Sequence, residues 1–408
     1  MSDAAPVAST GLSRRAWTRV LCAALIVTLA MGVRQAFGLF LRPISMDLEI
    51  GRQGFGLAIA LQNLLFGLIQ PFVGAWADKH GAGKVIVGGA LLYIAGLVAA
   101  TFAGGLIGLT LSFGFMVGLS MAGVTFVVVI GAISRVVPPH KRTLAFGLVT
   151  AGGSLGQFLV VPAAQGLLDW LDWKGALFAM SLLIAAIIPL ALGLAGKPDR
   201  GATQDGPPLK AALAEAFAHP SFWFLNLSFF VCGFHIAFVG THLPAYIRDE
   251  GLSAGVGAGA LALIGLFNIA GSWLWGVWGG ARSKKGLLAL LYFGRAVAMA
   301  VFLLVPLSPL SVLVFASAFG FLWLGTVPLT SGLVGHIYGI RHMSALFGIV
   351  FMSHQVGAFF GAWLAGLAFD ATHSYGQMWI ASILLALMAA AASLPVQERA
   401  IDRAPVPA

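Results

Sequence analysis

The chain has 408 residues, of which 59% are hydrophobic and only 9% are charged, and its formal net charge is +9. A soluble domain usually carries about 25% charged residues, so the composition excludes a water-soluble protein and predicts an integral membrane protein. The positive charge does not indicate a nucleic-acid partner, because the basic residues lie between long apolar runs, where membrane topology explains them. Cys22 and Cys232 both lie inside apolar runs, which argues against a disulfide framework or a metal site.

Twelve apolar stretches are long enough to cross a bilayer, which takes about 20 residues each. They are unlike the short alternating segments of an outer-membrane barrel, so they predict an all-α membrane fold. No small-residue cleavage site follows the first run, which is therefore expected to be a retained helix rather than a signal peptide. The expected spans lie near residues 17–41, 54–76, 85–103, 106–134, 143–168, 174–196, 221–246, 255–280, 286–307, 309–335, 343–369 and 375–395.

The distribution of Lys and Arg between the spans predicts the orientation of the chain. With the N-terminus in the cytoplasm, 17 basic residues lie on that side and four lie on the other, namely Arg42, Arg52, Lys174 and Arg248. This excess predicts a multi-pass protein of the cell inner membrane with both termini in the cytoplasm. Of the 23 basic residues, the remaining two, Arg34 and Arg295, fall inside the membrane.

The polar segment 197–220 lies at the middle of the chain, and we expect it to be a cytoplasmic linker with a short amphipathic helix at 209–218. A shift of 201 residues aligns similar positions in three pairs of spans across this linker. The alignment predicts two six-helix halves, 1–196 and 221–408, with the substrate site between them near the membrane midplane. The aligned positions include Gly32 with Gly233, Arg34 with His235, Pro43 with Pro244, Thr125 with Thr326, and Gly156 with Gly357.

A short charged segment joins the second and third spans. It reads Gly74-Ala-Trp-Ala-Asp78-Lys79-His-Gly81-Ala-Gly-Lys84 and resembles the loop signature of the major facilitator superfamily. The resemblance covers nearly the whole chain and implies twelve helices in two pseudo-symmetric halves, with these five named residues in a gate. Asp78 would lie beside the start of helix 11, where an acid contributes about 0.3–1 kcal/mol to holding the cytoplasmic side shut. The alternative is an ordinary charged turn set by topology.

Two further segments resemble bacterial relatives of monocarboxylate transporters and oxalate:formate antiporters. They are Gly32-Val-Arg34-Gln-Ala-Phe-Gly-Leu-Phe in helix 1 and Ser353-His354-Gln355-Val-Gly357 in helix 11. The resemblance implies a transporter of small organic anions. The chain departs from that pattern in helix 8, where those families place an arginine and this chain reads Asn268-Ile-Ala-Gly-Ser272, and in helix 11, where His354 replaces the lysine of the exchangers.

Arg34 is the principal candidate for binding a substrate anion. It lies 15 residues beyond Arg19, roughly 22 Å into a hydrocarbon core of about 30 Å, where a charge costs about 2.5–3.5 kcal/mol and needs a reason. We expect it to bind an anion in a water-filled cavity, the alternative being a structural arginine satisfied by helix-end carbonyls. We expect His235 to face Arg34 across the cavity and His354 to lie near the midplane; the alternative for each is a packed, hydrogen-bonded histidine.

Three embedded amides, Asn63, Asn268 and Gln355, are further candidates for substrate binding, although such groups also join helices to one another. Arg295 lies in helix 9, which is peripheral in this superfamily. We expect it to brace the second half against Asn268 or backbone carbonyls, with substrate contact as the alternative.

The acidic residues narrow the class of substrate. All 14 Asp and Glu residues lie in loops, termini or helix ends, so the charge in mid-membrane is wholly basic. A site built from Arg and His has a positive potential that favours a small anion and repels organic cations. Antiporters that export cationic drugs generally need an embedded acid, and none is present in this sequence.

We therefore expect a secondary active transporter of small organic anions, chiefly monocarboxylates, that works by alternating access with proton coupling or exchange. The alternative is an efflux pump for amphiphilic or toxic compounds. An enzyme is not expected, because no Ser/His/Asp set, metal spacing or phosphate loop appears, and no cofactor or metal is implied. The expected partners are the organic anion, a proton if transport is proton-coupled, and the lipid bilayer, with a single chain functional as a monomer.

Overall fold

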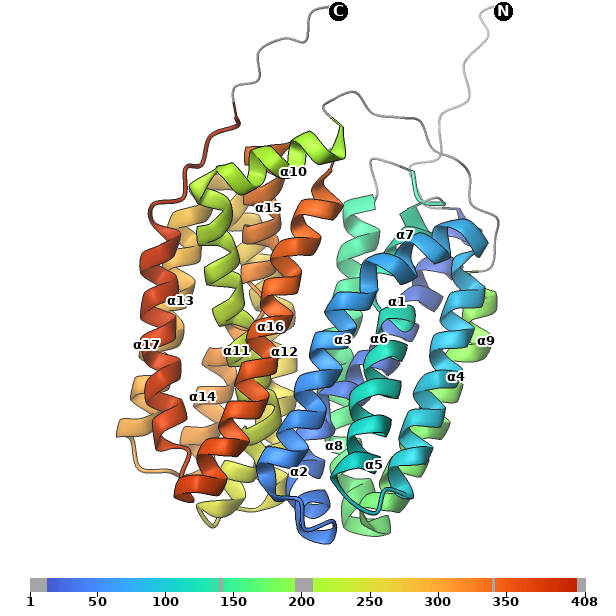
Figure 1. Cartoon of the computed structure of the whole chain (residues 1–408), viewed down its shortest axis with the longest axis vertical. Helices are drawn as coiled ribbons and strands as arrows, with labels where there is room; N and C mark the ends of the chain where they lie inside the picture. Colours follow the sequence, from blue (N-terminus) through green and yellow to red (C-terminus); the bar gives the residue numbers. More distant parts are fainter. Residues whose placement is uncertain (1–12, 135, 139–141, 195–207, 340–341, 402–408) are drawn as a thin grey trace, which may run out of the picture.

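The computed structural model describes residues 13–134, 136–138, 142–194, 208–339 and 342–401, and all regular structure within these ranges is helical (Figure 1). Helices satisfy every backbone polar group internally, as a bilayer requires, and the all-α prediction is confirmed. The first half contains α1 (Arg14–Gln35), α2 (Phe37–Asp47), α3 (Gly51–His80), α4 (Ala82–Thr101), α5 (Leu106–Leu109), the π-helix η1 (Thr110–Val117), α6 (Gly118–Val124), α7 (Phe126–Ser134), α8 (Arg142–Ala185) and α9 (Ile187–Leu192). The rest contains α10 (Leu209–Ala218), α11 (Pro220–Asp249), α12 (Ala254–Ala281), α13 (Lys284–Leu304), α14 (Pro309–Phe321), α15 (Thr326–Tyr338), α16 (Met343–Thr372) and α17 (Gly376–Ser393).

Eleven continuous stretches of the described residues are long and apolar enough to cross a membrane. One of them, Ala145–Leu192, has 48 residues and would be about 72 Å long as one helix, more than twice the core of a bilayer. Asp172 divides it, with a backbone φ of 59°, and its carboxylate accepts a hydrogen bond of 2.8 Å from the amide of Gly175. Two crossings therefore lie in this stretch, which brings the described residues to the predicted twelve.

Two of the predicted spans are interrupted at equivalent positions. The span predicted at 106–134 breaks at Thr125, whose backbone is extended between α6 and α7. The span predicted at 309–335 breaks between α14 and α15, and α15 restarts at Thr326. These two threonines are a pair under the 201-residue shift, so the internal repeat extends to the position of a helix break. The short helix predicted at 209–218 is also confirmed, as α10.

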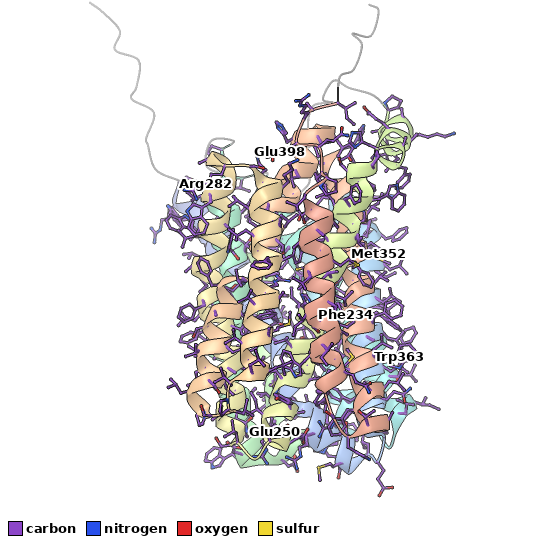
Figure 2. The ribbon with its side chains drawn as sticks, turned by 90° about the vertical axis from the view of Figure 1, so that its left-hand side faces the viewer. Phe234, Glu250, Arg282, Met352, Trp363 and Glu398 are labelled. Atoms are coloured by element: carbon purple, nitrogen blue, oxygen red, sulfur yellow. The ribbon has the colours of Figure 1, made fainter. Side chains whose placement is uncertain are left out.

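The two ends of the bundle carry different groups. Figure 2 shows Arg282 and Glu398 at one end, which also carries α10, and Glu250 at the opposite end. We name these the α10 end and the Asp370 end, the latter after the acid near the close of α16. Large apolar side chains such as Phe102 are exposed on the outside of the bundle, which suits a surface covered by lipid.

The two halves meet closely from the Asp370 end to the middle of the bundle. A Cβ atom on Gly38 of α2 would lie 2.1 Å from the Gly240 carbonyl oxygen of α11. A Cβ atom on Gly56 of α3 would lie 2.5 Å from the Ala362 oxygen of α16. No side chain fits at such distances, so glycine allows the helices of the two halves to touch along their backbones.

The predicted gating segment contains a one-residue connection between two membrane-spanning helices. Gly81 alone joins α3 to α4, with a φ of 97° that a residue with a side chain rarely adopts. Lys79 and Lys84 are exposed beside it, and Gly74 lies one turn or more earlier on α3. The side chain of Asp78 is not among those that the structure describes, so its contact with the start of α16 stays a prediction.

Candidate functional site

Arg34 lies at the end of α1, at a bend where α1 gives way to α2. Its guanidinium donates to the side-chain oxygen of Asn63 on α3, and the Asn63 amide nitrogen donates to the Ile59 carbonyl at 2.8 Å. Asn63 is buried, whereas Arg34 is partly exposed. Among the described residues, Arg34 has an amide partner but no carboxylate partner, so its charge is left available to an anion.

Two phenyl rings connect Arg34 to the second half. The guanidinium lies 5.8 Å from the centre of the Phe66 ring, and Phe66 meets Phe351 of α16 edge to face, with centroids 5.9 Å apart. Phe351 in turn stacks on the His354 imidazole at 5.6 Å and with almost parallel planes. Arg34 and His354 therefore belong to one continuous array of side chains that crosses between the halves.

His354 and Gln355 form a polar pair in the middle of α16. The His354 Nδ1 atom and the Gln355 side-chain oxygen are 3.0 Å apart, and the amide nitrogen of Gln355 is buried without a partner among the described residues. The backbone of α16 touches α11 here, because a Cβ atom on Gly233 would lie 1.8 Å from the His354 oxygen. An amide donor left free beside a histidine can serve an anion, as the sequence predicted for Gln355.

The expectation that His235 faces Arg34 is wrong. The His235 ring is fully buried, and its Nε2 atom lies 2.9 Å from the Ser382 carbonyl oxygen of α17, the last helix of the second half. The repeat aligns the backbone positions of Arg34 and His235. It does not fix the direction of the side chain, because α11 is apolar on every side and gives the histidine a partner in its own half.

Asn268 joins three helices. Its amide nitrogen donates to Ser154 of α8 at 2.7 Å, and its oxygen accepts from Ser272 at 3.0 Å and from the Leu324 backbone amide at 2.9 Å. These bonds use the donor and acceptor groups of the side chain. They connect the two halves and support the break between α14 and α15. Its role as a substrate ligand stays a prediction.

Arg295 braces backbone carbonyls, as the sequence led us to expect. It is fully buried on α13, and its guanidinium donates to the Leu322 carbonyl at 3.0 and 2.8 Å and also to the Trp323 carbonyl. These carbonyls are freed by the break between α14 and α15, and a cation is the natural partner for such groups. The expected contact with Asn268 is replaced by this clamp on the neighbouring backbone.

A family model described as the Major Facilitator Superfamily matches residues 23–362. The chain belongs to the Major Facilitator Superfamily. It is a membrane transporter by family and not an enzyme.

Several curated members of the superfamily are similar over most of their length. An uncharacterized MFS-type transporter, YcxA of Bacillus subtilis, is 24% identical over 84% of this chain and 85% of its own. Monocarboxylate transporter 13 of Bos taurus is 27% identical over 89% of this chain and 85% of its own. Monocarboxylate transporter 11 of Homo sapiens is 27% identical over 90% and 79%.

Solved structures of superfamily members share the fold. A bacterial homolog of the human lysosomal transporter Spinster, in an inward-facing and unoccupied conformation, has a TM-score of 0.69 at 17% identity and covers 95% of both chains. The same homolog in an inward-facing and occupied conformation has a TM-score of 0.71 at 18% identity, over 92% of this chain and 96% of that chain.

Among the described residues, an ionic contact that the sequence did not predict joins the two halves. Arg52 at the start of α3 binds the Asp249 carboxylate of α11 through both terminal nitrogens, and donates to the Tyr375 hydroxyl at 2.9 Å. Asp370 of α16 accepts from the backbone amides of Arg52 and Gln53 at 3.0 and 2.8 Å. We name Arg52, Asp249, Asp370 and Tyr375 the outer latch. Its signal in the sequence is Asp370, an acid near the end of α16, which mirrors Asp78 near the end of α3.

A buried histidine backs the outer latch. The Nδ1 atom of His242 lies 3.0 Å from the Tyr375 hydroxyl, and its Nε2 atom lies 2.8 Å from the Ala362 carbonyl. Burial raises the pKa of Tyr375, although Arg52 opposes the rise, so the phenol stays protonated and donates to Nδ1. The Arg52 guanidinium also lies 3.5 Å from the centre of the Phe369 ring. The latch is therefore held by charge, hydrogen bonds and an aromatic face together.

Proposed function

We propose that the protein is a secondary active transporter of small organic anions, with monocarboxylates as the principal class, that works by alternating access. The observation that carries the proposal is Arg34, a cation in mid-membrane that is partly exposed and has only the Asn63 amide as a polar partner among the described residues. A guanidinium matches a carboxylate with two parallel hydrogen bonds. The names of the monocarboxylate transporters that the chain resembles support the same class of substrate.

The free energy of the site favours an anion as the missing partner. An arginine at the bilayer centre costs about 2.5–3.5 kcal/mol on insertion scales, and an amide oxygen neutralises none of its charge. A carboxylate in the cavity would cancel that charge, while Phe66 and Phe351 would pack against the apolar part of a small acid. The unpartnered amide nitrogen of Gln355 would supply a further hydrogen-bond donor from the second half, with His354 beside it.

The closed Asp370 end supports a conformation that opens toward the α10 end. The outer latch and the glycine contacts hold the halves together on the Asp370 side, while Phe351 and Arg34 retain partial exposure. Both Spinster-homolog structures of similar fold are inward-facing. The proposal places the α10 end and both termini in the cytoplasm and the protein in the cell inner membrane.

Gating would alternate between the two ends of the α3 and α16 pair. When the carrier faces outward, Asp78 and the Gly74–Lys84 segment would hold the cytoplasmic end shut, and the outer latch would be released. One chain contains both halves of the cavity and would work as a monomer in the bilayer. Transport would take either a proton or a counter-anion to complete the cycle.

A ligand-binding experiment tests the role of Arg34. The purified protein is heated with formate, lactate, pyruvate or oxalate, or with lipophilic drugs, and its thermal midpoint Tm is measured. A ligand at 100 times its Kd stabilises the folded state by about 2.7 kcal/mol, so a binding carboxylate should raise the Tm. The stabilisation should vanish in Arg34→Gln. It should persist in the control variant Arg42→Gln, which removes an arginine from α2 instead. Stabilisation by drugs alone, indifferent to Arg34, would instead establish the efflux alternative.

A further inference from the structure

Arg295 is a buried cation without an acidic partner. Its side chain is fully buried, and its Nη1 atom has no hydrogen-bond partner among the described residues. In the part of the chain that the structure describes, no Asp or Glu forms an ion pair with Arg295. Backbone carbonyls satisfy the hydrogen bonds of a guanidinium but do not neutralise it, and an uncompensated buried charge is strongly unfavourable. A negative charge beside Arg295 would therefore stabilise the second half.

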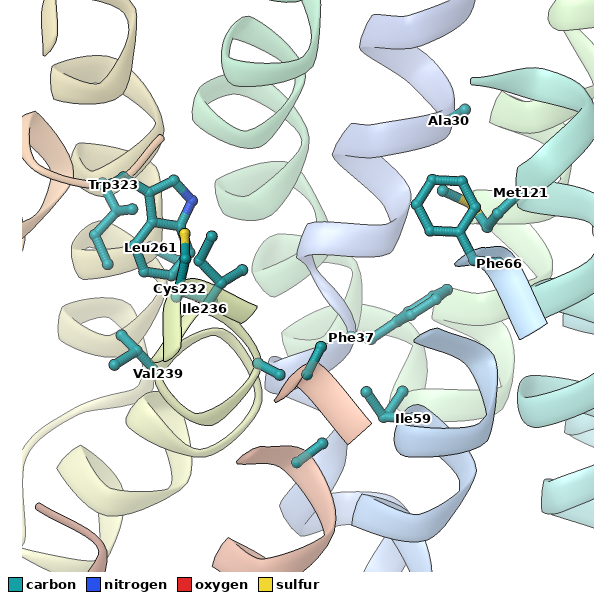
Figure 3. Close-up of a cluster of buried hydrophobic side chains, with 14 of the residues drawn as sticks. Ala30, Phe37, Ile59, Phe66, Met121, Cys232, Ile236, Val239, Leu261 and Trp323 are labelled. Atoms are coloured by element: carbon teal, nitrogen blue, oxygen red, sulfur yellow. The ribbon is translucent and has the colours of Figure 1, made fainter. Parts of the chain in front are cut away.

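Cys232 of α11 is the ionisable group in that position. Its sulfur lies 3.6 Å from Nη2 of Arg295 and 3.1 Å from the hydroxyl oxygen of Thr326. The thiol is completely buried, and Figure 3 shows it beside Trp323 in the core of the second half. The His354 ring is also within reach of the thiol. Helices α11, α13, α15 and α16 thus meet at one sulfur atom.

We propose that Cys232 is the membrane-embedded acid of this transporter and carries the coupled proton. In the empty carrier, the S–H bond breaks, its electron pair stays on sulfur, and the proton leaves by way of His354 to water in the cavity, leaving a thiolate paired with Arg295 and a neutral imidazole. When an anion binds at Arg34, the thiolate takes up one proton from the cavity by way of His354. The site then gains one negative and one positive charge, so its net charge is unchanged. This inference rests on the proposed function.

The groups around the Cys232 sulfur can hydrogen-bond to both the thiol and the thiolate. With the Nδ1 proton of His354 donated to Gln355, Nε2 of the neutral ring is left to accept the thiol proton. The Thr326 hydroxyl can donate to a thiolate or accept from a thiol. The charged or titratable groups that act on Cys232 are Arg295 and Tyr292 of α13 and His354 of α16. Tyr292 donates its hydroxyl proton to the Ser228 carbonyl and stays neutral.

Packed side chains connect the surroundings of the sulfur to the anion site. His354 acts on Cys232 and stacks on Phe351, and Phe351 meets Phe66, whose ring centre lies 5.8 Å from the Arg34 guanidinium. An anion at Arg34 would draw positive charge toward the His354 ring, which is the group that delivers the proton to sulfur. A Cys–His pair beside a cation is a recognised setting for a reactive thiolate.

The thiolate itself can be observed without a substrate. Cys22 is the second cysteine of the chain, so Cys22→Ser leaves Cys232 as the single thiol, and Cys22→Ser with Cys232→Ser is the matched control. The ultraviolet absorbance of a thiolate is measured in detergent between about pH 5 and about pH 8, where a free thiol of ordinary acidity is largely protonated. We expect about one thiolate per chain near the upper limit in Cys22→Ser and none in the control. Absence of the signal in Cys22→Ser would overturn the proposal.

Proton uptake tests the coupling. The carboxylate that stabilises the protein most among formate, lactate, pyruvate and oxalate is titrated by calorimetry in buffers of different ionisation enthalpy. In Cys22→Ser we expect about one proton to be taken up for each anion bound, together with loss of the thiolate absorbance. We expect no uptake when Cys22→Ser is combined with Cys232→Ser or Cys232→Ala. Undiminished uptake without Cys232 would refute the coupling role. If none of these carboxylates binds, the proposed function and the coupling role fail together, while the absorbance still decides whether the thiolate exists.

Discussion

Arg52 and Asp249 form a two-point ion pair between the halves, in which Nη2 of the guanidinium lies 2.7 Å from one carboxylate oxygen. The side chains are only 11% and 23% exposed, so solvent screens the pair less than it screens a surface salt bridge. The Asp370 carboxylate also accepts two hydrogen bonds from backbone amides in the same turn of α3. The outer latch therefore ties α3 to both α11 and α16 in the conformation described here.

Loss of the ion pair should open the Asp370 end. We predict that Arg52→Gln or Asp249→Asn weakens the closed arrangement by about 1.5–3 kcal/mol, the usual net contribution of a hydrogen bond to a charged group. A cysteine reporter at Ile59 of α3, which is buried in this conformation, should then react faster with a membrane-impermeant thiol reagent applied from the Asp370 side. The double variant should be little worse than either single one, because the two residues act as one contact. An unchanged labelling rate would contradict the assignment of the latch.

A methyl group between the halves should act in the same direction by sterics. A Cβ atom at Gly56 would press on the Ala362 oxygen at 2.5 Å, so we predict that Gly56→Ala shifts the carrier away from this conformation. Overpacking of this kind typically costs about 1–3 kcal/mol. Gly88→Ala is the matched control, because a Cβ atom there meets nothing within 4 Å. Labelling of the same Ile59 reporter should rise in the first variant and stay level in the control.

Removal of the Arg295 clamp at the break between α14 and α15 should lower the stability of the folded protein. Arg295→Gln shortens the side chain and leaves the Leu322 and Trp323 carbonyls without their donor, at about 1–3 kcal/mol for each buried group. We predict a clear fall in Tm, and rapid amide exchange at the start of α15. Arg282→Gln, which removes an exposed arginine from the same half, should leave both measurements unchanged. Equal behaviour of the two variants would show that the clamp contributes nothing to stability.

Glu398 gives a prediction for the pH dependence of stability. It accepts hydrogen bonds from the Ser283 hydroxyl at 2.8 Å and the Lys284 amide at 3.0 Å, at the start of α13. Burial alone would raise the pKa of Glu398, but these bonds and the amide of Lys285 outweigh it and lower the pKa. A carboxyl with a lowered folded-state pKa stabilises the protein above its unfolded value of about 4.3, and the benefit is lost as the pH falls through the folded value.

Replacement of this carboxylate should remove that dependence. Glu398→Gln is expected to cost about 0.5–2 kcal/mol near neutral pH, as for loss of a helix cap, and the difference from wild type should shrink in acid. Thermal unfolding from about pH 7 down to about pH 2, which passes through both the unfolded value and the lower folded value, measures it. Glu250→Gln, an exposed acid at the opposite end, provides the control. A difference that grows in acid would reverse the assigned sign.

Hydropathy and the repeat predicted the fold because both depend on where the backbone lies. The spans follow from the length of apolar runs, and the Thr125 and Thr326 pair even marks equivalent helix breaks. The direction of single side chains was harder to predict. A helix that is apolar on all sides carries no periodic signal of which face meets the cavity, so His235 was assigned to the wrong side. The contacts of Arg52 were not predicted because Arg52, Asp249 and Asp370 lie more than 100 residues apart in the sequence.

The Cys232 cluster belongs to one half alone. Under the 201-residue shift, Thr326 corresponds to Thr125, but Cys232 corresponds to Met31, Arg295 to Ile94 and His354 to Gly153. The internal repeat therefore reproduces the backbone of the two halves but not this chemistry. Under the two proposals above, the first half would bind the anion, and the second half would supply the proton that balances its charge.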